Sequence, residues 1–198
     1  GDICVVLSPS HEIKVFAEGA QLFTFRNAGW HLLDISAKYE MWAEAVGDRA
    51  FAERIFQIAL DLADARQGAL FVVLRDPQHA MSRLIAPGDR LDAIAPADAT
   101  SGVPSRRDLM YLLANRNVTE FSRAVLEALS TMDGATVMDR SGRLLAVGAI
   151  LRHAHVGEVV VEGARTTAAI AAAQFGPVLK VSEDGVVTFF DGERIWDI

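Results

Sequence analysis

Two stretches of this sequence decide its fold: Met132-Asp133-Gly134-Ala135-Thr136-Val137-Met138 and Gly163-Ala164-Arg165-Thr166-Thr167-Ala168-Ala169. In the first, an Asp-Gly pair, which is typical of turns, leads into an apolar run that predicts a strand. In the second, a glycine precedes an alanine-rich segment that predicts a helix from Arg165 to Phe175, which Gly176-Pro177 stops. Turns that open onto regular elements are where α/β domains commonly carry their binding sites.

The segment before these stretches combines a helix with a buried strand. Apolar residues from Phe51 to Ala63 recur at helical spacing, and Gly68 is expected to end that helix. The continuous apolar run Ala69–Leu74 predicts a strand that is buried on both faces. A loop led by Asp76-Pro77 is expected to follow this strand.

Residues 1–50 show a different pattern, in which short apolar and alternating runs predict a small antiparallel unit of strands. A short helix over Ala37–Val46 closes that segment. Near the other end of the chain, turns at Arg140-Ser141-Gly142 and Asp184-Gly185 predict two hairpins. The sequence therefore predicts an α/β domain that is preceded by a β-rich extension.

The composition excludes several classes of protein. With 198 residues, 51% of them apolar, the chain is long enough for one α/β domain with a core. The net charge of −7 argues against nucleic acid as a partner, and no apolar run is long enough for a membrane-spanning helix. The single cysteine, Cys4, excludes an internal disulfide and favours a cytoplasmic setting. Because the chain begins Gly1-Asp2 without Met, we expect it to be a piece of a longer protein.

Common catalytic motifs are missing from the sequence. It contains no Gly-x-Gly-x-x-Gly, no Walker-type Gly-Lys-Ser/Thr and no Gly-x-Ser-x-Gly. His153 and His155 are two residues apart and fit either a pair of metal ligands on one strand face or histidines of a loop. No third ligand stands at a recognisable spacing from them, so the sequence favours the loop.

From about Phe51 to Ile198 the chain resembles the diadenylate cyclase family of the DisA N-terminal type. Four stretches carry the resemblance in order: Gln67–Val73, Met132–Met138, Gly163–Ala169 and Val181–Gly185. The resemblance implies a central mixed β-sheet flanked by helices, with residues 51–198 as the nucleotide-binding domain and 1–50 as an extension. Members of the family join two ATP molecules into cyclic di-AMP between two head-to-head subunits, so a homodimer is one expected partner arrangement.

The first motif is intact in this chain. The resemblance gives Asp133 a catalytic, metal-linked role in activating the ribose 3′-hydroxyl, and its carboxylate suits Mg²⁺ or Mn²⁺ that bridges triphosphate oxygens. Gly134 and Ala135 are expected to bind the nucleotide, because a glycine lets a phosphate or base approach the backbone closely. Asp133-Gly134 is equally open to a plain interpretation, in which it only starts a strand.

The second motif is altered. The family has Arg-His-Arg where this chain has Arg165-Thr166-Thr167. Gly163, Ala164 and Arg165 at the start of a helix suit an anion, because N–H groups and the helix dipole point outward there. Thr166 and Thr167 can add hydroxyl donors but neither an imidazole nor a second guanidinium, which weakens support for a triphosphate in the transition state.

The resemblance places one further pair, Ser182 and Glu183, near the phosphates and the metal. Both residues also fit the polar end of a hairpin strand, and the sequence leaves that alternative open.

Three functions remain open from the sequence. The first is a degenerate diadenylate-cyclase-like domain that binds ATP, another adenine nucleotide or a cyclic dinucleotide as a sensor or regulatory module. The second is an active diadenylate cyclase, and the third is a protein-interaction domain without nucleotide. The deciding feature is whether a cation from elsewhere, such as Arg152, His153 or Lys180, reaches the space in front of Arg165.

Overall fold

The computed structural model describes residues 2–8, 11–17, 20–26, 28–94, 105–152 and 163–198. His153 and His155 lie outside these ranges. By density of contacts the chain divides into Gly1–Glu40 with Ile198, and Met41–Asp197. The second and larger unit contains both sequence motifs. The role of residues 1–50 as an extension to a nucleotide-binding domain stays a prediction.

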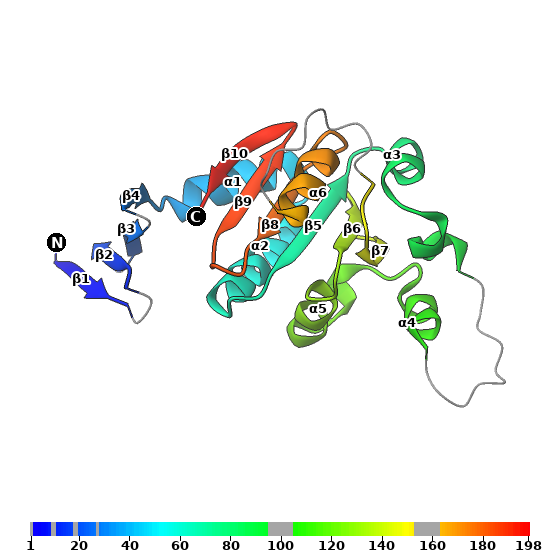
Figure 1. Ribbon diagram of the computed structural model, residues 1–198, viewed down its shortest axis with the longest axis horizontal. Helices are drawn as coiled ribbons and strands as arrows, with labels where there is room; N and C mark the ends of the chain where they lie inside the picture. The colour runs from blue at the N-terminus through cyan, green and yellow to red at the C-terminus, as the bar shows by residue number, and fades with distance from the viewer. Residues whose placement is uncertain (1, 9–10, 18–19, 27, 95–104, 153–162) are drawn as a thin grey trace. The chain divides into compact units, whose positions relative to one another are not determined.

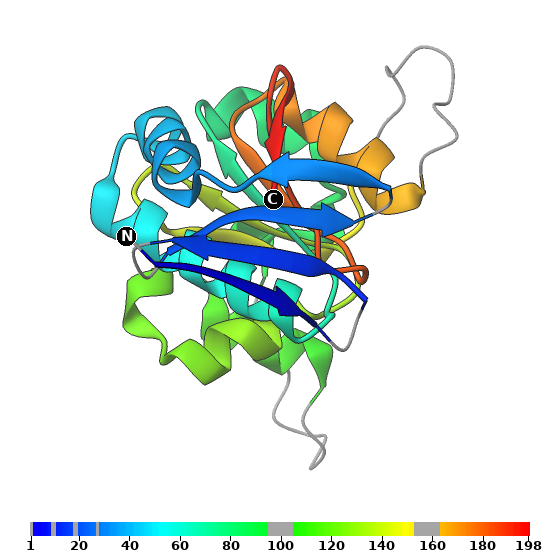
Figure 2. The same ribbon diagram turned by 90° about the vertical axis from the view of Figure 1, so that its left-hand side faces the viewer.

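The smaller unit is an antiparallel sheet. Its strands are β1 (Ile3–Leu7), β2 (Ile13–Ala17), β3 (Ala20–Arg26) and β4 (Gly29–Leu32). They pair in sequence order, as Figure 2 shows, and every pair is antiparallel. Helix α1 (Ile35–Val46) follows β4 and continues into the larger unit. The predicted small unit of strands is therefore confirmed.

The larger unit is built on a mixed sheet. Its strands are β5 (Ala69–Leu74), β6 (Ala135–Asp139), β7 (Leu144–Ala149), β8 (Val178–Val181), β9 (Val187–Asp191) and β10 (Glu193–Asp197). Within the described residues the strand order is β10-β9-β8-β5-β6-β7. Strand β5 runs parallel to β6 and antiparallel to β8, and the other pairs are antiparallel. The predicted α/β fold with a central mixed sheet is confirmed.

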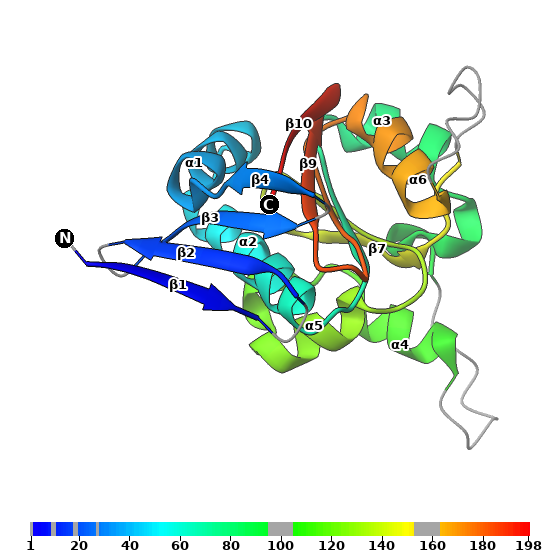
Figure 3. The ribbon, with the colours of Figure 1, turned by 60° about the vertical axis from the view of Figure 1, so that its left-hand side comes forward.

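Helices cover both faces of this sheet. They are α2 (Arg49–Asp64), α3 (Pro77–Leu84), α4 (Arg106–Leu113), α5 (Arg123–Ser130) and α6 (Ala164–Ala173). The 3-10 helices of the described residues lie between them and are Pro87–Asp89, Leu91–Ala93 and Val118–Glu120. Figures 1 and 3 show α6 and α2 on opposite faces, each in contact with β5 and β8. Within the described parts of the chain, no helix combines the length and apolar character needed to cross a bilayer.

Strand β5 forms the centre of the core, and all six of its residues are buried. Leu70, Val72 and Leu74 alternate onto one face, where they belong to the same buried cluster as Ala172 of α6 and Leu84 of α3. Burial on both faces explains the uninterrupted apolar run that the sequence shows at this position. Because β5 is held from both sides, the residues at its ends have fixed positions.

Two local predictions were wrong. The segment after Asp76 is helix α3 and not a loop, because the Asp76 carboxylate accepts from the His79 backbone N–H at 3.3 Å and Pro77 starts the helix. Helix α2 ends at Asp64, well before Gly68, and Arg66 takes the positive φ of 57°. Gly68 therefore does not cap helix α2.

Small side chains allow α6 to lie close to the sheet. Ala169 and Ala172 are fully buried, as expected for residues one turn apart on the stripe that faces β5 and β8. We expect Ala172→Leu to overpack this contact and lower the free energy of unfolding by about 1–3 kcal/mol. Denaturant unfolding measures the effect, and Ala164→Leu is the control, because Ala164 is exposed on the same helix. Equal stability of the two variants would contradict close packing of α6.

Candidate functional site

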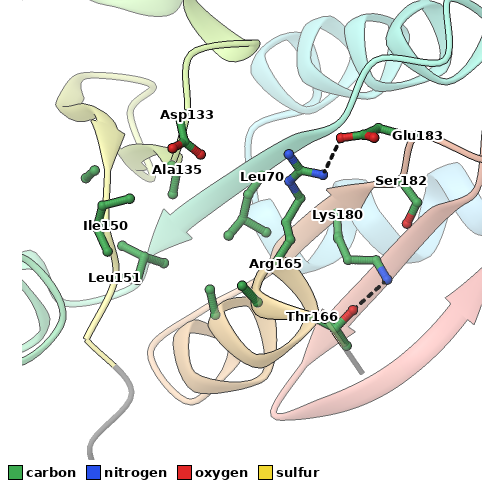
Figure 4. Close-up of a pocket in the computed structure, with 15 residues that line it drawn as sticks. Leu70, Asp133, Ala135, Ile150, Leu151, Arg165, Thr166, Lys180, Ser182 and Glu183 are labelled. Atoms are coloured by element: carbon green, nitrogen blue, oxygen red, sulfur yellow. Dashed lines mark hydrogen bonds and ion pairs between the residues drawn. The ribbon is translucent and has the colours of Figure 1, made fainter. Parts of the chain in front are cut away.

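A cavity of about 510 Å³ opens where α6 begins and where β6, β7 and β8 meet their loops. Figure 4 shows the side chains that surround it. The cavity is lined by Leu70, Asp133, Gly134, Ala135, Ala149, Ile150, Leu151, Gly163, Ala164, Arg165, Thr166, Ala168, Lys180, Ser182 and Glu183. These residues include nearly every site residue that the sequence predicted. Thr167 is the exception.

Asp133 and Gly134 lie in the turn that leads into β6. The Asp133 side chain is exposed and reaches the cavity from the β6 and β7 side. Gly134 has a φ of 108°, and a Cβ there would lie 2.6 Å from the Ala149 carbonyl oxygen. The backbone of β7 therefore requires glycine at this position. The sequence predicted that glycine is needed here for the close approach of a ligand, but the space beside Gly134 is filled by the backbone of Gly148 and Ala149.

Helix α6 starts at the cavity with Gly163 as its N-cap residue. The Gly163 carbonyl accepts from the backbone N–H groups of Thr166 and Thr167 at 3.1 and 3.2 Å. The Thr167 hydroxyl also turns back to this carbonyl, at 3.4 Å, which explains why it does not line the cavity. Thr166 does line it, so the two threonines of the altered motif have different surroundings.

Arg165 extends from the first turn of α6 across the start of β5. Its guanidinium lies 3.5 Å from the Glu183 carboxylate, with exposed side-chain fractions of 36% for Arg165 and 74% for Glu183. An ion pair that is so exposed contributes little to stability. A Cβ on Gly68 would lie 2.6 Å from the guanidinium carbon. Gly68 thus leaves the space in which the Arg165 side chain crosses the sheet.

Lys180 is a second cation at the cavity, supplied by β8. Its ammonium donates to the Thr166 hydroxyl at 3.1 Å, as Figure 4 shows. Arg152 is exposed and does not line the cavity, and His153 lies outside the described residues. Of the cations that the sequence analysis named as candidates, the described structure brings Lys180 to the site.

The cations and the large apolar side chains of the cavity lie on different sides, and the Asp133 carboxylate shares the side of Ile150 and Leu151. In Figure 4, Arg165, Lys180, Thr166 and Glu183 lie toward α6 and β8, while Ile150 and Leu151 lie toward β7. The remaining apolar lining comes from small residues of β6, β7 and α6 and from Leu70 of β5. An apolar side next to a cationic side suits a ligand with a flat ring at one end and an anion at the other.

Sequence reasoning named Lys180 only as one of three candidate cations, and it missed both the role of Gly68 and the apolar side of the cavity. Lys180 carried a signal, because it is the charged residue in the otherwise apolar run Val178–Val181. The apolar lining carried no such signal, since Ile150 fits the end of an ordinary strand and Leu151 the start of the loop after it.

The acidic residues of the site do not form a protein-only metal centre. Among the described residues there is no group of three or more His, Cys, Asp or Glu side chains that could hold a metal ion. Asp133 and Glu183 reach the cavity from different sides. Mg²⁺ is often held by one or two carboxylates together with the phosphates of a substrate. A single carboxylate such as Asp133 fits that kind of binding.

No protein-family model matches the chain, and no curated protein matches it. Solved structures do share its fold. DacA from Staphylococcus aureus, solved as a double mutant, aligns with a TM-score of 0.50 and 19% identity over 75% of this chain and 87% of DacA. A hypothetical membrane spanning protein from Bacillus cereus aligns with a TM-score of 0.50 and 23% identity, over 74% of this chain and 62% of the other. At these identities the likeness shows the fold alone, and that fold is diadenylate-cyclase-like.

Proposed function

We propose that this chain is a diadenylate-cyclase-like domain that binds an adenine nucleotide or cyclic dinucleotide and has lost or weakened synthesis. The observation that supports the proposal is the shared cavity of the two motifs: Asp133 and Gly134 line it from one side, and Gly163, Arg165 and Thr166 line it from the other. Its volume of about 510 Å³ falls in the range of small-molecule sites. In this role the domain would act as a sensor or regulatory module.

The two sides of the cavity suggest how a nucleotide would lie. The base would contact the apolar side formed by Ile150 and Leu151, and the phosphates would lie at the start of α6 near Arg165. Backbone N–H groups and the helix dipole at that point favour negative charge. The Arg165–Glu183 ion pair would open as phosphates take the place of the carboxylate.

A divalent cation would belong to the bound nucleotide. Asp133 is the residue that would hold Mg²⁺ or Mn²⁺, with triphosphate oxygens as further ligands. Such an ion would neutralise phosphate charge and stabilise a displaced oxygen. Asp133 itself would orient the ion from the β6 side of the cavity.

Synthesis needs more than binding. Thr166 and Thr167 provide neither an imidazole nor a guanidinium for the charge that develops on a transferring phosphoryl group. Removing one fixed donor of this kind commonly lowers the rate by roughly a hundredfold or more. Ground-state binding tolerates the loss better, because only interactions that strengthen in the transition state raise the rate.

Calorimetry and product analysis on the same sample test the proposal. We expect the protein to bind ATP or cyclic di-AMP in the presence of Mg²⁺ or Mn²⁺ and to yield little or no cyclic di-AMP from ATP by chromatography. Robust synthesis would establish the active cyclase instead, for which Lys180 at the cavity is the favouring observation. No binding up to about 1 mM ligand, where weak sites fill, would favour a protein-interaction domain.

The oligomeric state belongs in the same experiment. Cyclisation requires two nucleotides to face each other from two subunits, and the mass of one chain is 21.4 kDa. Light scattering with and without ATP therefore separates a paired, synthesis-competent arrangement from a monomeric sensor. A dimer that forms without product would show that the chemistry, and not the assembly, has been lost.

A further inference from the structure

We propose that Lys180 is a phosphate-binding residue of this cavity and that Thr166 positions it, so that the pair replaces the altered part of the α6 motif. The inference rests on the proposed nucleotide site and names the ligand group that it recognises: a di- or triphosphate. It also accounts for one of the two threonines in the altered motif.

The position of Lys180 in the sheet is unusual for a lysine. Its neighbours on β8, Leu179 and Val181, are fully buried, while Lys180 is half-buried and lines the cavity. It pairs with Leu70 of β5 on one side and with Thr188 of β9 on the other. Lysine is rarely placed in the interior of a sheet, because desolvation of its ammonium is costly. At this position the ammonium adds positive charge to the wall of the cavity.

Thr166 contributes to the position of the ammonium. The Lys180 Nζ donates to the Thr166 Oγ1 at 3.1 Å, which holds the end of a flexible side chain next to the first turn of α6. An ammonium group has three hydrogen-bond donors and binds phosphates as a compact positive charge. Thr166 therefore contributes to the site by positioning Lys180, and its hydroxyl also lines the cavity.

Lys180 and Arg165 flank the same region. Both side chains extend between Thr166 and Glu183 in Figure 4, at the start of α6. Two cations and a helix start, set against the Glu183 carboxylate, favour a ligand that carries more than one negative charge. A lysine is neither a bidentate fork nor a proton-transferring imidazole, so it strengthens binding of phosphates more than their transfer.

The affinity for nucleotides with different numbers of phosphates tests this role. In calorimetry we expect wild-type protein to bind ATP and ADP more tightly than AMP or adenosine. Lys180→Met is expected to weaken ATP binding roughly tenfold and to leave adenosine binding unchanged. Lys14→Met is the matched control, because it removes the same charge from β2, outside the cavity. Equal ATP affinity of wild type and Lys180→Met would overturn the inference.

A second measurement follows Lys180 itself in the wild-type protein. The chain has three lysines, Lys14, Lys38 and Lys180, so reductive methylation with ¹³C gives few NMR signals, and Lys180 is the one in the larger unit. We expect its dimethylammonium signal to shift with ATP and not with adenosine. In the absence of ligand, Thr166→Val should also shift the Lys180 signal, because the hydrogen bond to Lys180 is lost. If the Thr166 hydroxyl contacted only the ligand, the signal would stay in place.

Failure of this inference differs from failure of the proposed function. If wild-type protein binds none of the four compounds, the nucleotide site itself is wrong. If it binds ATP and adenosine equally, or if the Lys180 signal stays in place while ATP binds, the site holds a nucleotide but Lys180 does not contact its phosphates.

Discussion

Gly134→Ala is expected to lower the free energy of unfolding by about 2–4 kcal/mol, because the new methyl group meets both backbone strain and a filled space. The φ of 108° is one that residues with a Cβ rarely adopt, and the Cβ would lie 2.6 Å from the Gly148 carbonyl carbon. Strain of this kind and overpacking each cost about 1–3 kcal/mol. Denaturant unfolding, followed by tryptophan fluorescence, measures the change.

Gly47→Ala separates the two causes. Gly47 has a similar φ of 88°, but a Cβ there would meet nothing within 4 Å. It is therefore expected to show the cost of the backbone conformation without the clash, and to lose about 1 kcal/mol. If Gly134→Ala lost no more stability than Gly47→Ala, the strand β7 would not be what requires glycine before β6. The Asp-Gly pair would then be a turn like any other, open to a ligand.

The sequence predicted the parts of the fold that depend on local pattern. The run Ala69–Leu74 is apolar throughout because β5 is buried on both faces, and a buried strand needs no other signal. The turn Arg140-Ser141-Gly142 joins β6 to β7 because Asp139 accepts from the backbone N–H groups of Ser141 and Arg143, at 2.9 and 3.1 Å. In both cases the residues that determine the structure are neighbours in the chain.

What the sequence did not predict depends on residues that are distant in the chain. Gly68 reads as a helix cap, because glycine commonly follows a helix, yet its smallness leaves room for the Arg165 side chain. Lys180 gains its partner Thr166 only when β8 packs against α6. Strand β10 (Glu193–Asp197) pairs with β9 through an irregular register, which breaks the alternation by which strands are recognised. Propensity and spacing contain no information on such contacts.

The same contrast between neighbouring and distant residues applies to the candidate site. Asp133 and Arg165 were identified from motifs, and the structure places both at one cavity, although their roles stay predictions. The motif comparison alone suggested that the site lost two cationic or basic groups. The structure shows one cation, Lys180, next to the first of the two changed positions. The altered motif of α6 and the lysine of β8 are far apart in the sequence, so their proximity is seen only in the folded structure.

Arg165→Met is expected to weaken binding of ATP by roughly 10- to 150-fold, the range for losing hydrogen bonds from a charged donor. Arg165 lies in the first turn of α6, where a cation is unfavourable unless an anion is near, and Glu183 is its partner in the described structure. The variant should therefore keep or slightly gain stability while it loses affinity. Calorimetry with ATP and a thermal melt of the same sample measure both. A loss of stability with unchanged affinity would assign Arg165 a structural role and remove it from the site.

Gly68→Ala tests whether the position of Arg165 matters as well as its charge. The added Cβ would lie 2.6 Å from the guanidinium carbon and 2.9 Å from Nη2, so the side chain must move away while the net charge stays the same. Because the end of an arginine side chain is flexible, the expected cost in stability is small. The ATP affinity of Gly68→Ala is expected to lie between the affinities of wild type and Arg165→Met. Gly88→Ala is the control, since a Cβ at Gly88 meets nothing within 4 Å. If Gly68→Ala binds ATP as wild type does, the guanidinium reaches the phosphates from more than one position, and the space above β5 is not a condition for binding.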